Sequence, residues 1–473
     1  MELLSISPID GRYARCTSEL RYYFSEYSFI KYRLFIEIEY LITLGLYELY
    51  PIELETIPFL RDIHETFDID ECKIVKEIEN TTKHDVKSIE YYIRDKIIDT
   101  YGRNASILNF IHFGLTSQDI NSSANILMIK ESLEEVLIPK MNDILHCMKS
   151  LSNKWKSIPL LARTHGQPAT PTTLGKEMCV FHERLYNQMT SLKSIKYTTK
   201  FGGATGNFNA HHYAKPDLDW DAFADNFIKL FNLKRNKPTT QIDHYDNYSE
   251  IFDALKRINV ICIDLCQDMW LYISRNIIIH KIVKGEVGSS TMPFKINPIN
   301  FENAEGNFLL SNSMLEFFSR KLPISRLQRD LTDSTILRNV GSSFSYMLIG
   351  LSSLYEGLNK IEVNEGAIYK ELTENFVVVT EGLQTRLKIL GIKDSYETMK
   401  ELSRDYYDAE SIKTKLTEFI NGLDIDDNEG IFEINYAFQL YWKIIYLLYI
   451  LYYKWTRFGI IHLMKISCND FRI

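Results

Sequence analysis

The stretch from Gly288 to Glu302 carries residue types that are suited to chemistry on an anionic ligand. It contains two hydroxyls, an ammonium group and an amide, at Ser289, Ser290, Lys295 and Asn297. Gly285 and Gly288 give the backbone freedom at one end. Pro293 and Pro298 stiffen the middle and discourage a helix there. A hinged, stiff and polar loop is what a lid over an anionic ligand needs, although a plain serine- and glycine-rich connector fits the same residues.

Other polar segments add histidines, cations and amides. They lie at His84, His165, Arg12, Arg329, Arg338, Gln241 and Asn303. Serine together with histidine first suggests hydrolysis, but the chain has no Gly-x-Ser-x-Gly elbow. It also has no His/Cys spacing typical of a metal site and no Walker loop. The density of cations and amides instead favours a polyanionic small molecule and metal-free proton transfer.

The composition narrows the class of protein further. The chain has 473 residues, of which 45% are hydrophobic and 25% charged, an ordinary mixture for a soluble globular protein. Its net charge of -8 argues against a nucleic-acid partner. Seven scattered cysteines indicate a reducing compartment, and Cys262 and Cys266 have the spacing of core residues. The N-terminal residues do not resemble a signal peptide. We therefore predict a cytoplasmic protein.

Apolar residues repeat at heptad-like spacing in several long segments. These seams run from Leu133 to Trp155, Thr173 to Ile195, Ile251 to Tyr272 and Val340 to Ile361. Seams of this kind bury one stripe against other helices, and Pro139 should kink the first helix. The three seams that start at Leu133, Ile251 and Val340 are more apolar surface than one chain of this layout is expected to bury alone. No alternating βαβ pattern occurs, so we predict an all-α fold.

Shorter elements are predicted between these seams. A helix is expected from Ser25 to Leu46, and another from Val86, with Asp85 as its N-cap. Residues 1–20 are expected to be irregular. The glycines at 202, 203 and 206 do not form a dinucleotide fingerprint, since no suitable strand precedes them. The apolar run Ile444–Tyr453 is about half the ~20 residues of a membrane span, so no membrane helix is predicted.

Taken together, the ordered motifs resemble the bacterial-type adenylosuccinate lyase family, within the fumarase/aspartase superfamily. They are Arg12-Tyr13, Thr81 to Asp85, Thr116-Ser117, Arg163 to Thr172, Gly203 to His211, Gly288 to Glu302 and Gln328 to Arg338. The resemblance extends over residues 1 to about 436. It implies three all-α regions: an N-terminal domain over 1–110, a long-helix bundle over 111–364 and a small domain over 365–473. It also implies a homotetramer whose active sites are shared between subunits.

The resemblance further implies a reaction. The family eliminates fumarate from adenylosuccinate to give AMP, and from the succinyl-carboxamide ribotide SAICAR to give AICAR, in purine biosynthesis. No metal and no cofactor is implied. By resemblance, Ser289 is the general base and His165 the general acid. A serine is a poor base at its free pKa, so it needs nearby positive charge, for which Lys295 is the obvious local candidate.

The remaining roles are also implied by the resemblance. Lys295 and Asn297 would hold the carboxylate that gains charge, His84 would assist, and Glu302 is a candidate to orient His165. Glu302 is alternatively a helix N-terminal acid. The implied substrate-binding residues are Arg12, Tyr13, Lys83, His84, Asp85, Thr116, Ser117, Gln241, Lys295, Asn297, Asn303, Arg329, Ser334, Thr335 and Arg338. At position 83 this family branch often has asparagine, so the lysine is a departure.

Two alternatives and one anomaly stay open at this level. A lyase acting on argininosuccinate or aspartate fits less well, because Gln328 to Arg338 is interpreted as a phosphate site. A catalytically silent lens crystallin of the same superfamily fits less well, because Ser289, His165 and Lys295 are intact. From about residue 437 the chain departs from the family, and this tail is either a real extension or a translated intron or shifted frame.

Overall fold

The computed structural model describes residues 2–281, 291–404 and 408–423. Ser289, Ser290 and the atypical tail therefore lie outside the described residues. The described chain forms two compact units, each built from segments that are not consecutive. Unit 1 comprises Met1–Asn142, Asn187–Ile263 and Asn303–Ser353, and unit 2 comprises Asp143–Tyr186, Asp264–Glu302 and Leu354–Ile473. The three consecutive domains stay a prediction.

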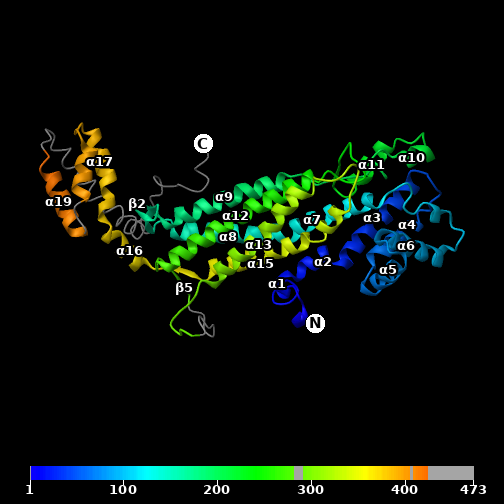
Figure 1. The fold of residues 1–473 in the computed structure, drawn as a ribbon, viewed down its shortest axis with the longest axis horizontal. Coiled ribbons are helices and arrows are strands. Elements are labelled where there is room, and N and C mark those ends of the chain that lie inside the picture. The colour runs from blue at the N-terminus through cyan, green and yellow to red at the C-terminus, as the bar shows by residue number, and fades with distance from the viewer. Residues whose placement is uncertain (1, 282–290, 405–407, 424–473) are drawn as a thin grey trace, which may run out of the picture. The chain divides into compact units, whose positions relative to one another are not determined.

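The secondary structure is mainly helical, which confirms the predicted all-α class (Figure 1). The elements that lie within unit 1 are α1 Ala14–Thr17, α2 Arg21–Phe24, α3 Glu26–Leu46, α4 Thr56–Glu65, α5 Ile69–Thr82, α6 Asp85–Tyr101, α7 Ser117–Ser132, α10 Asn209–Ala214, α11 Trp220–Lys229 and α14 Thr332–Leu337, with strands β3 Thr198–Thr199 and β4 Lys234–Arg235. Unit 1 also contains short 3-10 turns at Glu2–Leu4, Ser18–Leu20 and Ser106–Asn109. Residues 1–20, expected to be irregular, thus contain short helical turns.

Unit 2 holds the smaller elements of the C-terminal half. They are β1 Pro159–Thr164, β2 Gln167–Thr173, β5 Ile278–His280, β6 Ile361–Val363, α16 Glu365–Glu374, the 3-10 turn Phe376–Val379, α17 Thr380–Ile389, α18 Ser395–Arg404 and α19 Ala409–Asn421. The long helices contribute residues to both units: α8 Ile138–Trp155, α9 Leu174–Ser194, α12 Asp246–Ser274, α13 Ile299–Lys321 and α15 Val340–Asn359. Among the described residues, no helix is both long and apolar enough to cross a membrane.

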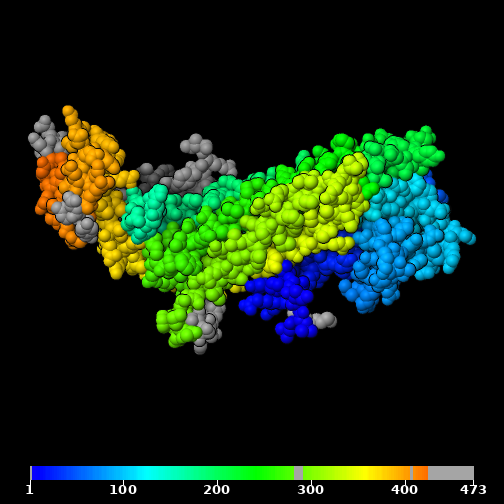
Figure 2. Space-filling model, in the orientation of Figure 1, coloured from blue at the N-terminus to red at the C-terminus, as the bar shows by residue number. Residues whose placement is uncertain are grey.

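Helix α3 shows how the sequence builds the core of unit 1. Ser25 caps its first turn by accepting a hydrogen bond from the Ser28 amide, close to the predicted start. The ring of Tyr40 on α3 packs edge-on against Phe223 and Phe227 of α11. In the space-filling view, α10 and α11 lie beside the light-blue α4 to α6 region, although they are far apart in sequence (Figure 2).

The predicted seams are buried, but within a single chain. Almost every seam residue is buried, including Cys262 and Cys266, as predicted for core residues. The expectation that one chain could not bury these stripes is therefore wrong, because the helices of this chain cover one another. Just before Pro139, residues Leu133–Leu137 form a π-helical turn, a local irregularity at the predicted site of a kink. The last seam residue, Ile361, lies in β6 and not in a helix.

The strands were not anticipated from the sequence. Within the described residues they form three two-stranded sheets: β1 with β2 and β5 with β6 are antiparallel, whereas β3 with β4 is parallel. The β1–β2 hairpin occupies the segment around His165, which the sequence had indicated only as a polar connector between helices. Neither Pro159–Thr164 nor Gln167–Thr173 alternates apolar and polar residues, so the periodicity that indicates a strand is absent.

Candidate active site

Unit 1 contains a cavity of about 600 Å³ that gathers many of the predicted substrate-binding residues. The predicted residues on its wall are Lys83, His84, Asp85, Ser117, Arg329, Ser334, Thr335 and Arg338. The other wall residues are Phe29, Arg33, Glu79, Gln118, Asn121, Asn125, Leu331, Leu337 and Asn339. Segments around positions 30, 83, 120 and 334 thus converge on one site, which no local spacing in the sequence could reveal.

The junction between α5 and α6 presents the first group of side chains. Lys83 follows α5 in a left-handed conformation, with φ of 55°, and this residue reverses the chain direction. The N-cap of α6 is His84, so the prediction of Asp85 as the N-cap is wrong by one residue. The His84 Nδ1 atom accepts a hydrogen bond from the Lys87 amide at 3.1 Å. A neutral His84 must then carry its proton on Nε2, which makes Nε2 a donor.

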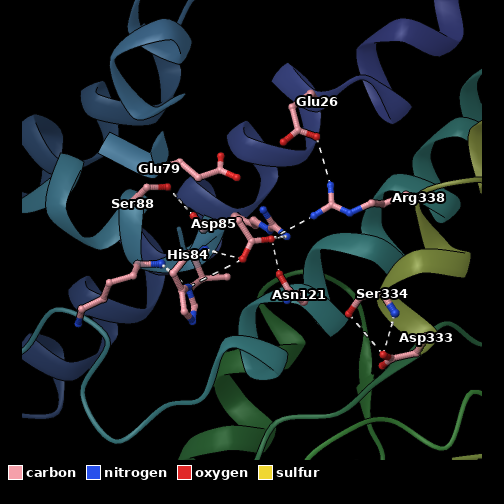
Figure 3. Close-up of polar contacts among 12 residues, drawn as sticks. Glu26, Glu79, His84, Asp85, Ser88, Asn121, Asp333, Ser334 and Arg338 are labelled. Carbon is pink, nitrogen blue, oxygen red and sulfur yellow. Dashed lines mark hydrogen bonds and ion pairs between the residues drawn. The ribbon is translucent and has the colours of Figure 1, made fainter. Parts of the chain in front are cut away.

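Asp85 occupies the first helical position and is held by two arginines. Its Oδ2 atom accepts from Arg33 Nη2 at 2.7 Å and from Arg338 Nη2 at 3.2 Å (Figure 3). Burial by itself favours the neutral acid, but the two guanidinium groups hold the pKa of the Asp85 carboxyl below its usual value. Arg33 also donates from Nε to Asn121 Oδ1 at 2.8 Å. The sequence analysis missed Arg33 and Asn121; the only available signal was a charge within an apolar helix.

The start of α7 is fixed by a buried carboxylate. Thr116 is the N-cap, and its amide donates to Asp119 Oδ2 at 2.9 Å in a capping box. The Asp119 Oδ1 atom accepts from Lys200 Nζ at 2.6 Å and from the Gly202 and Gly203 amides. The glycine-rich loop therefore binds a carboxylate of its own chain. This arrangement places Ser117, the first residue of α7, on the cavity wall.

The segment around α14 supplies the opposite group. The carboxylate of Asp333 accepts from the Ser334 amide at 2.7 Å, which orients Ser334 (Figure 3). It also accepts from Tyr245 Oη at 2.7 Å. Arg329 donates to Gln241 Oε1 at 3.2 Å, and Gln241 donates to the Ala204 carbonyl at 3.0 Å. Predicted residue Gln241 thus contacts a cavity residue. A side chain at Gly206 would meet the Thr239 carbonyl at 2.1 Å, so this loop requires glycine there.

The cavity wall is rich in cations for a chain of negative net charge. It includes Arg33, Lys83, Arg329 and Arg338, against the carboxylates of Glu79 and Asp85. Arginine forks match the oxygens of carboxylate and phosphate groups. The residues present here are therefore suited to hold an anionic small molecule.

Arg12, Tyr13 and Asn303 form a separate group in unit 1 that does not line the cavity. Tyr13 donates to Asn303 Oδ1 at 2.9 Å, and Asn303 donates to Ser353 Oγ at 2.5 Å. Arg12 lies near the ring of Tyr13, with its guanidinium carbon 5.9 Å from the ring centre. The structure brings these three residues together as a separate group.

In unit 2, His165 lies at the tip of the β1–β2 hairpin. His165 and Gly166 form a two-residue turn in which both have positive φ, at 53° and 75°, the pattern of a type I′ turn. Arg163 braces the turn by donating to the Gly166 carbonyl at 3.0 Å and to Glu371 at 2.6 Å. The imidazole of His165 is exposed on a braced turn, where it is accessible to a ligand.

The described part of the Gly288–Glu302 segment precedes and enters α13. Lys295 is exposed and Asn297 is half-buried. The helix starts at Ile299, so Glu302 lies within its first turn, where the alternative of a helix N-terminal acid places it. Glu302 Oε1 accepts from Trp270 Nε1 at 3.1 Å. In the described residues no hydrogen bond joins Glu302 to His165, and the orienting role of Glu302 stays a prediction.

Comparison with known proteins decides the family. A family model described as "Lyase" matches residues 11–309, and one described as "Adenylosuccinate lyase C-terminal" matches residues 325–432. An adenylosuccinate lyase of Dictyostelium discoideum is 50% identical over 435 residues, covering 90% of this chain and 93% of that protein. The chain belongs to the adenylosuccinate lyase family.

Bacterial members of the adenylosuccinate lyase family give the same result. The adenylosuccinate lyase of Escherichia coli K12 is 42% identical over 432 residues, covering 90% of this chain and 94% of that protein. Among solved structures, a fumarate lyase from Mesorhizobium sp. BNC1 matches with a TM-score of 0.72 at 15% identity, covering 90% of this chain and 97% of that chain. At this identity the match supports the fold alone.

Proposed function

We propose that this chain cleaves adenylosuccinate to AMP and fumarate, and SAICAR to AICAR and fumarate. The observation that carries the proposal is the cavity of unit 1. In a chain 50% identical to an adenylosuccinate lyase, His84, Ser117, Arg329, Ser334 and Arg338 all line this one cavity. Both substrates are polyanions that carry a phosphate, which suits the arginines of this wall.

The first chemical step removes a proton from the carbon next to a carboxylate. We assign this step to the Ser289 hydroxyl as general base, with Lys295 and Asn297 holding the carboxylate on which charge develops. Lys295 is exposed in the single chain, so its ammonium group is free to meet a ligand. Preorganised donors matter most where charge grows in the transition state.

The second step breaks the C–N bond and requires an acid for the leaving amine. We assign this role to His165, which the hairpin turn presents to solvent. The electron pair left by the departing proton forms the double bond of fumarate, and the electron pair of the C–N bond leaves with nitrogen. His84, whose Nε2 is a donor when the ring is neutral, is suited to assist by binding an anionic oxygen.

We further propose a cytoplasmic homotetramer in which each site combines loops of different subunits. The seams cannot provide the contact, since each chain buries them. Large apolar side chains remain exposed elsewhere on the long helices, at Val260 on α12 and at Leu309, Leu310 and Phe317 on α13. Exposed apolar side chains on rigid helices are suited to association with further copies of the chain.

Absorbance assays with adenylosuccinate, SAICAR and argininosuccinate test the activity. Turnover of the two purine substrates alone is expected. Turnover of argininosuccinate alone would favour an argininosuccinate lyase. No turnover of any substrate would favour a catalytically silent structural protein. Ser289→Ala is expected to lower kcat by at least about 10²–10⁴-fold while substrate binding persists. Activity of this variant within about threefold of wild type would remove Ser289 as the base.

A further inference from the structure

Arg338 is held in the chain by two carboxylates. Its Nη1 atom donates to Glu26 Oε2 at 3.3 Å, and its Nη2 atom donates to Asp85 Oδ2 at 3.2 Å. Figure 3 shows Arg338 extending toward Glu26 on one side and Asp85 on the other. Both terminal nitrogens of the guanidinium therefore engage the type of anionic oxygen that a phosphate group would also present.

The two carboxylates differ in how firmly they are held. Asp85 also accepts from the buried Arg33 at 2.7 Å and from the Val86 amide at 2.9 Å. Arg33 is only 2% exposed in its side chain, and its Nη1 atom is buried without a hydrogen-bond partner in the described structure. Because moving Asp85 away would leave the buried Arg33 cation without its carboxylate partner, which is costly, Asp85 is fixed in place.

Glu26 is the replaceable partner. Its side chain is 45% exposed, and it belongs to the first turn of α3, outside the residues that line the cavity. Its other oxygen, Oε1, accepts from Lys76 Nζ at 3.1 Å. If Arg338 turns to a ligand, Glu26 keeps a cationic partner and access to water. Loss of the exposed contact between Glu26 and Arg338 therefore costs little.

We propose that Glu26 is an affinity-setting residue that competes with the anionic group of the ligand for Arg338. An anion that enters the cavity engages Arg338 at the expense of Glu26, so the free energy of this ion pair is subtracted from the free energy of binding. The identification of that anion as a nucleotide phosphate rests on the proposed function. Because the phosphate does not react, Glu26 weakens the binding of substrate and AMP by the same factor.

The test compares Glu26→Gln with the matched control Glu365→Gln. Glu365 is likewise an exposed first residue of a helix behind a side-chain cap, at the start of α16, but it lies in unit 2. Isothermal titration with inorganic phosphate and with AMP gives Kd, and the lyase assay gives KM and kcat. Glu26→Gln is expected to lower Kd and KM by about two- to fivefold, the range of one exposed ion pair, with kcat changed less. Glu365→Gln is expected to match wild type.

Glu26→Asp separates contact from net charge, since it keeps the carboxylate but shortens its reach to Arg338. It is also expected to tighten phosphate binding. A wild-type Kd for Glu26→Asp beside a lowered Kd for Glu26→Gln would overturn the competition, as would unchanged or weaker phosphate binding by Glu26→Gln. Thermal melting of each variant confirms that it is folded.

The titrations keep this inference distinct from the proposed function. Tighter phosphate binding by Glu26→Gln in a protein without lyase activity would refute the proposed function and retain the role of Glu26. Lyase activity in the wild type, with an unchanged phosphate Kd in Glu26→Gln, would support the proposed function and refute the role of Glu26.

Discussion

Lys83 occupies a backbone conformation that suits asparagine better than lysine. Its φ of 55° lies in the left-handed region, directly after the last residue of α5. Asparagine tolerates this region well, whereas other residues with a Cβ atom are disfavoured there. The conformation fits the asparagine that the family resemblance implies at this position. The lysine that replaces it adds a cation to the cavity wall.

We predict that Lys83→Asn raises the free energy of unfolding by roughly 0.5–1 kcal/mol, since it relieves part of the left-handed strain. Urea denaturation measures the change, and Lys83→Ala, which keeps the strain, serves as control. If the ammonium group also contacts the substrate, KM rises in both variants. Equal stability of the asparagine and alanine variants would contradict the conformational explanation.

His112 is a partly buried histidine that no proposed chemical step uses. Its Nδ1 atom lies 2.5 Å from Glu37 Oε1, and its Nε2 atom lies 3.9 Å from Glu90 Oε1. Burial alone would lower the pKa of His112, but the Glu37 carboxylate raises it to about 9. The charged imidazolium is therefore the stable form in the folded protein at neutral pH.

We predict that this pair makes the free energy of unfolding fall as pH rises from about 6.5 to about 9. The folded pKa lies above the unfolded value, so the contribution is fully present below about pH 6.5 and lost through pH 9. The full loss is about 3 kcal/mol at most. Denaturation of wild type and His112→Asn at several pH values measures it; asparagine accepts the positive φ of this position. If the free energy of unfolding had the same slope against pH in both proteins across this window, the His112–Glu37 pair would not be the cause of the pH dependence.

The sequence could predict site residues only where a motif was already known. Motifs named five residues that the fold brings to one cavity: Lys83, His84, Asp85, Ser117 and Arg338. Arg33 and Glu26 belong to no quoted motif, and their meaning comes from contacts with residues far away in sequence, such as Asp85 and Arg338. Contacts of this kind depend on tertiary packing, which local spacing does not encode.

At the scale of elements, helix caps and turns determine where the site residues lie. The start of α3 was predicted well because Ser25 is a standard N-cap. The start of α6 was misplaced because His84 caps it, and histidine is not among the preferred N-cap residues. The hairpin that presents His165 was missed because its turn has histidine at a position where asparagine or glycine is usual.

The Lys200–Asp119 pair links two of these elements. Both side chains are fully buried, and Asp119 joins the N-terminus of α7 to the glycine-rich loop. We predict that Lys200→Met lowers the free energy of unfolding by about 3–5 kcal/mol, because it leaves an uncompensated buried carboxylate. Urea denaturation measures the loss, and KM is expected to rise because Ser117 shifts with α7.

The exposed pair of Lys73 with Asp70 gives the matched control for this prediction. Its side chains are 68% and 83% exposed. Lys73→Met is therefore expected to leave stability and KM close to wild type. If Lys200→Met were as stable as Lys73→Met, the buried pair would not organise these elements.

At the scale of the whole molecule, the heptad pattern indicated buried helices but not what buries them. Residues such as Leu255 and Phe344 are fully buried by the same chain. Heptad spacing of apolar residues shows that one face of a helix is buried. It does not show whether the covering helix belongs to the same chain or to a second copy. The exposed apolar residues on α12 and α13 are the surface that we propose for association.

The proposed sharing of sites between subunits leads to the last prediction. Inactive His84→Ala and Ser289→Ala proteins, dissociated, mixed and reassembled, are expected to regain activity. In a symmetric oligomer where each site draws on two chains at random, up to about a quarter of the sites would contain both wild-type residues. The structure supplies the control: His84 and Arg338 line the cavity of one chain, so mixing His84→Ala with Arg338→Ala should restore nothing. Equal, unrestored activity in both mixtures, with hybrid oligomers shown by mass spectrometry, would place His84 and Ser289 of each site in the same chain.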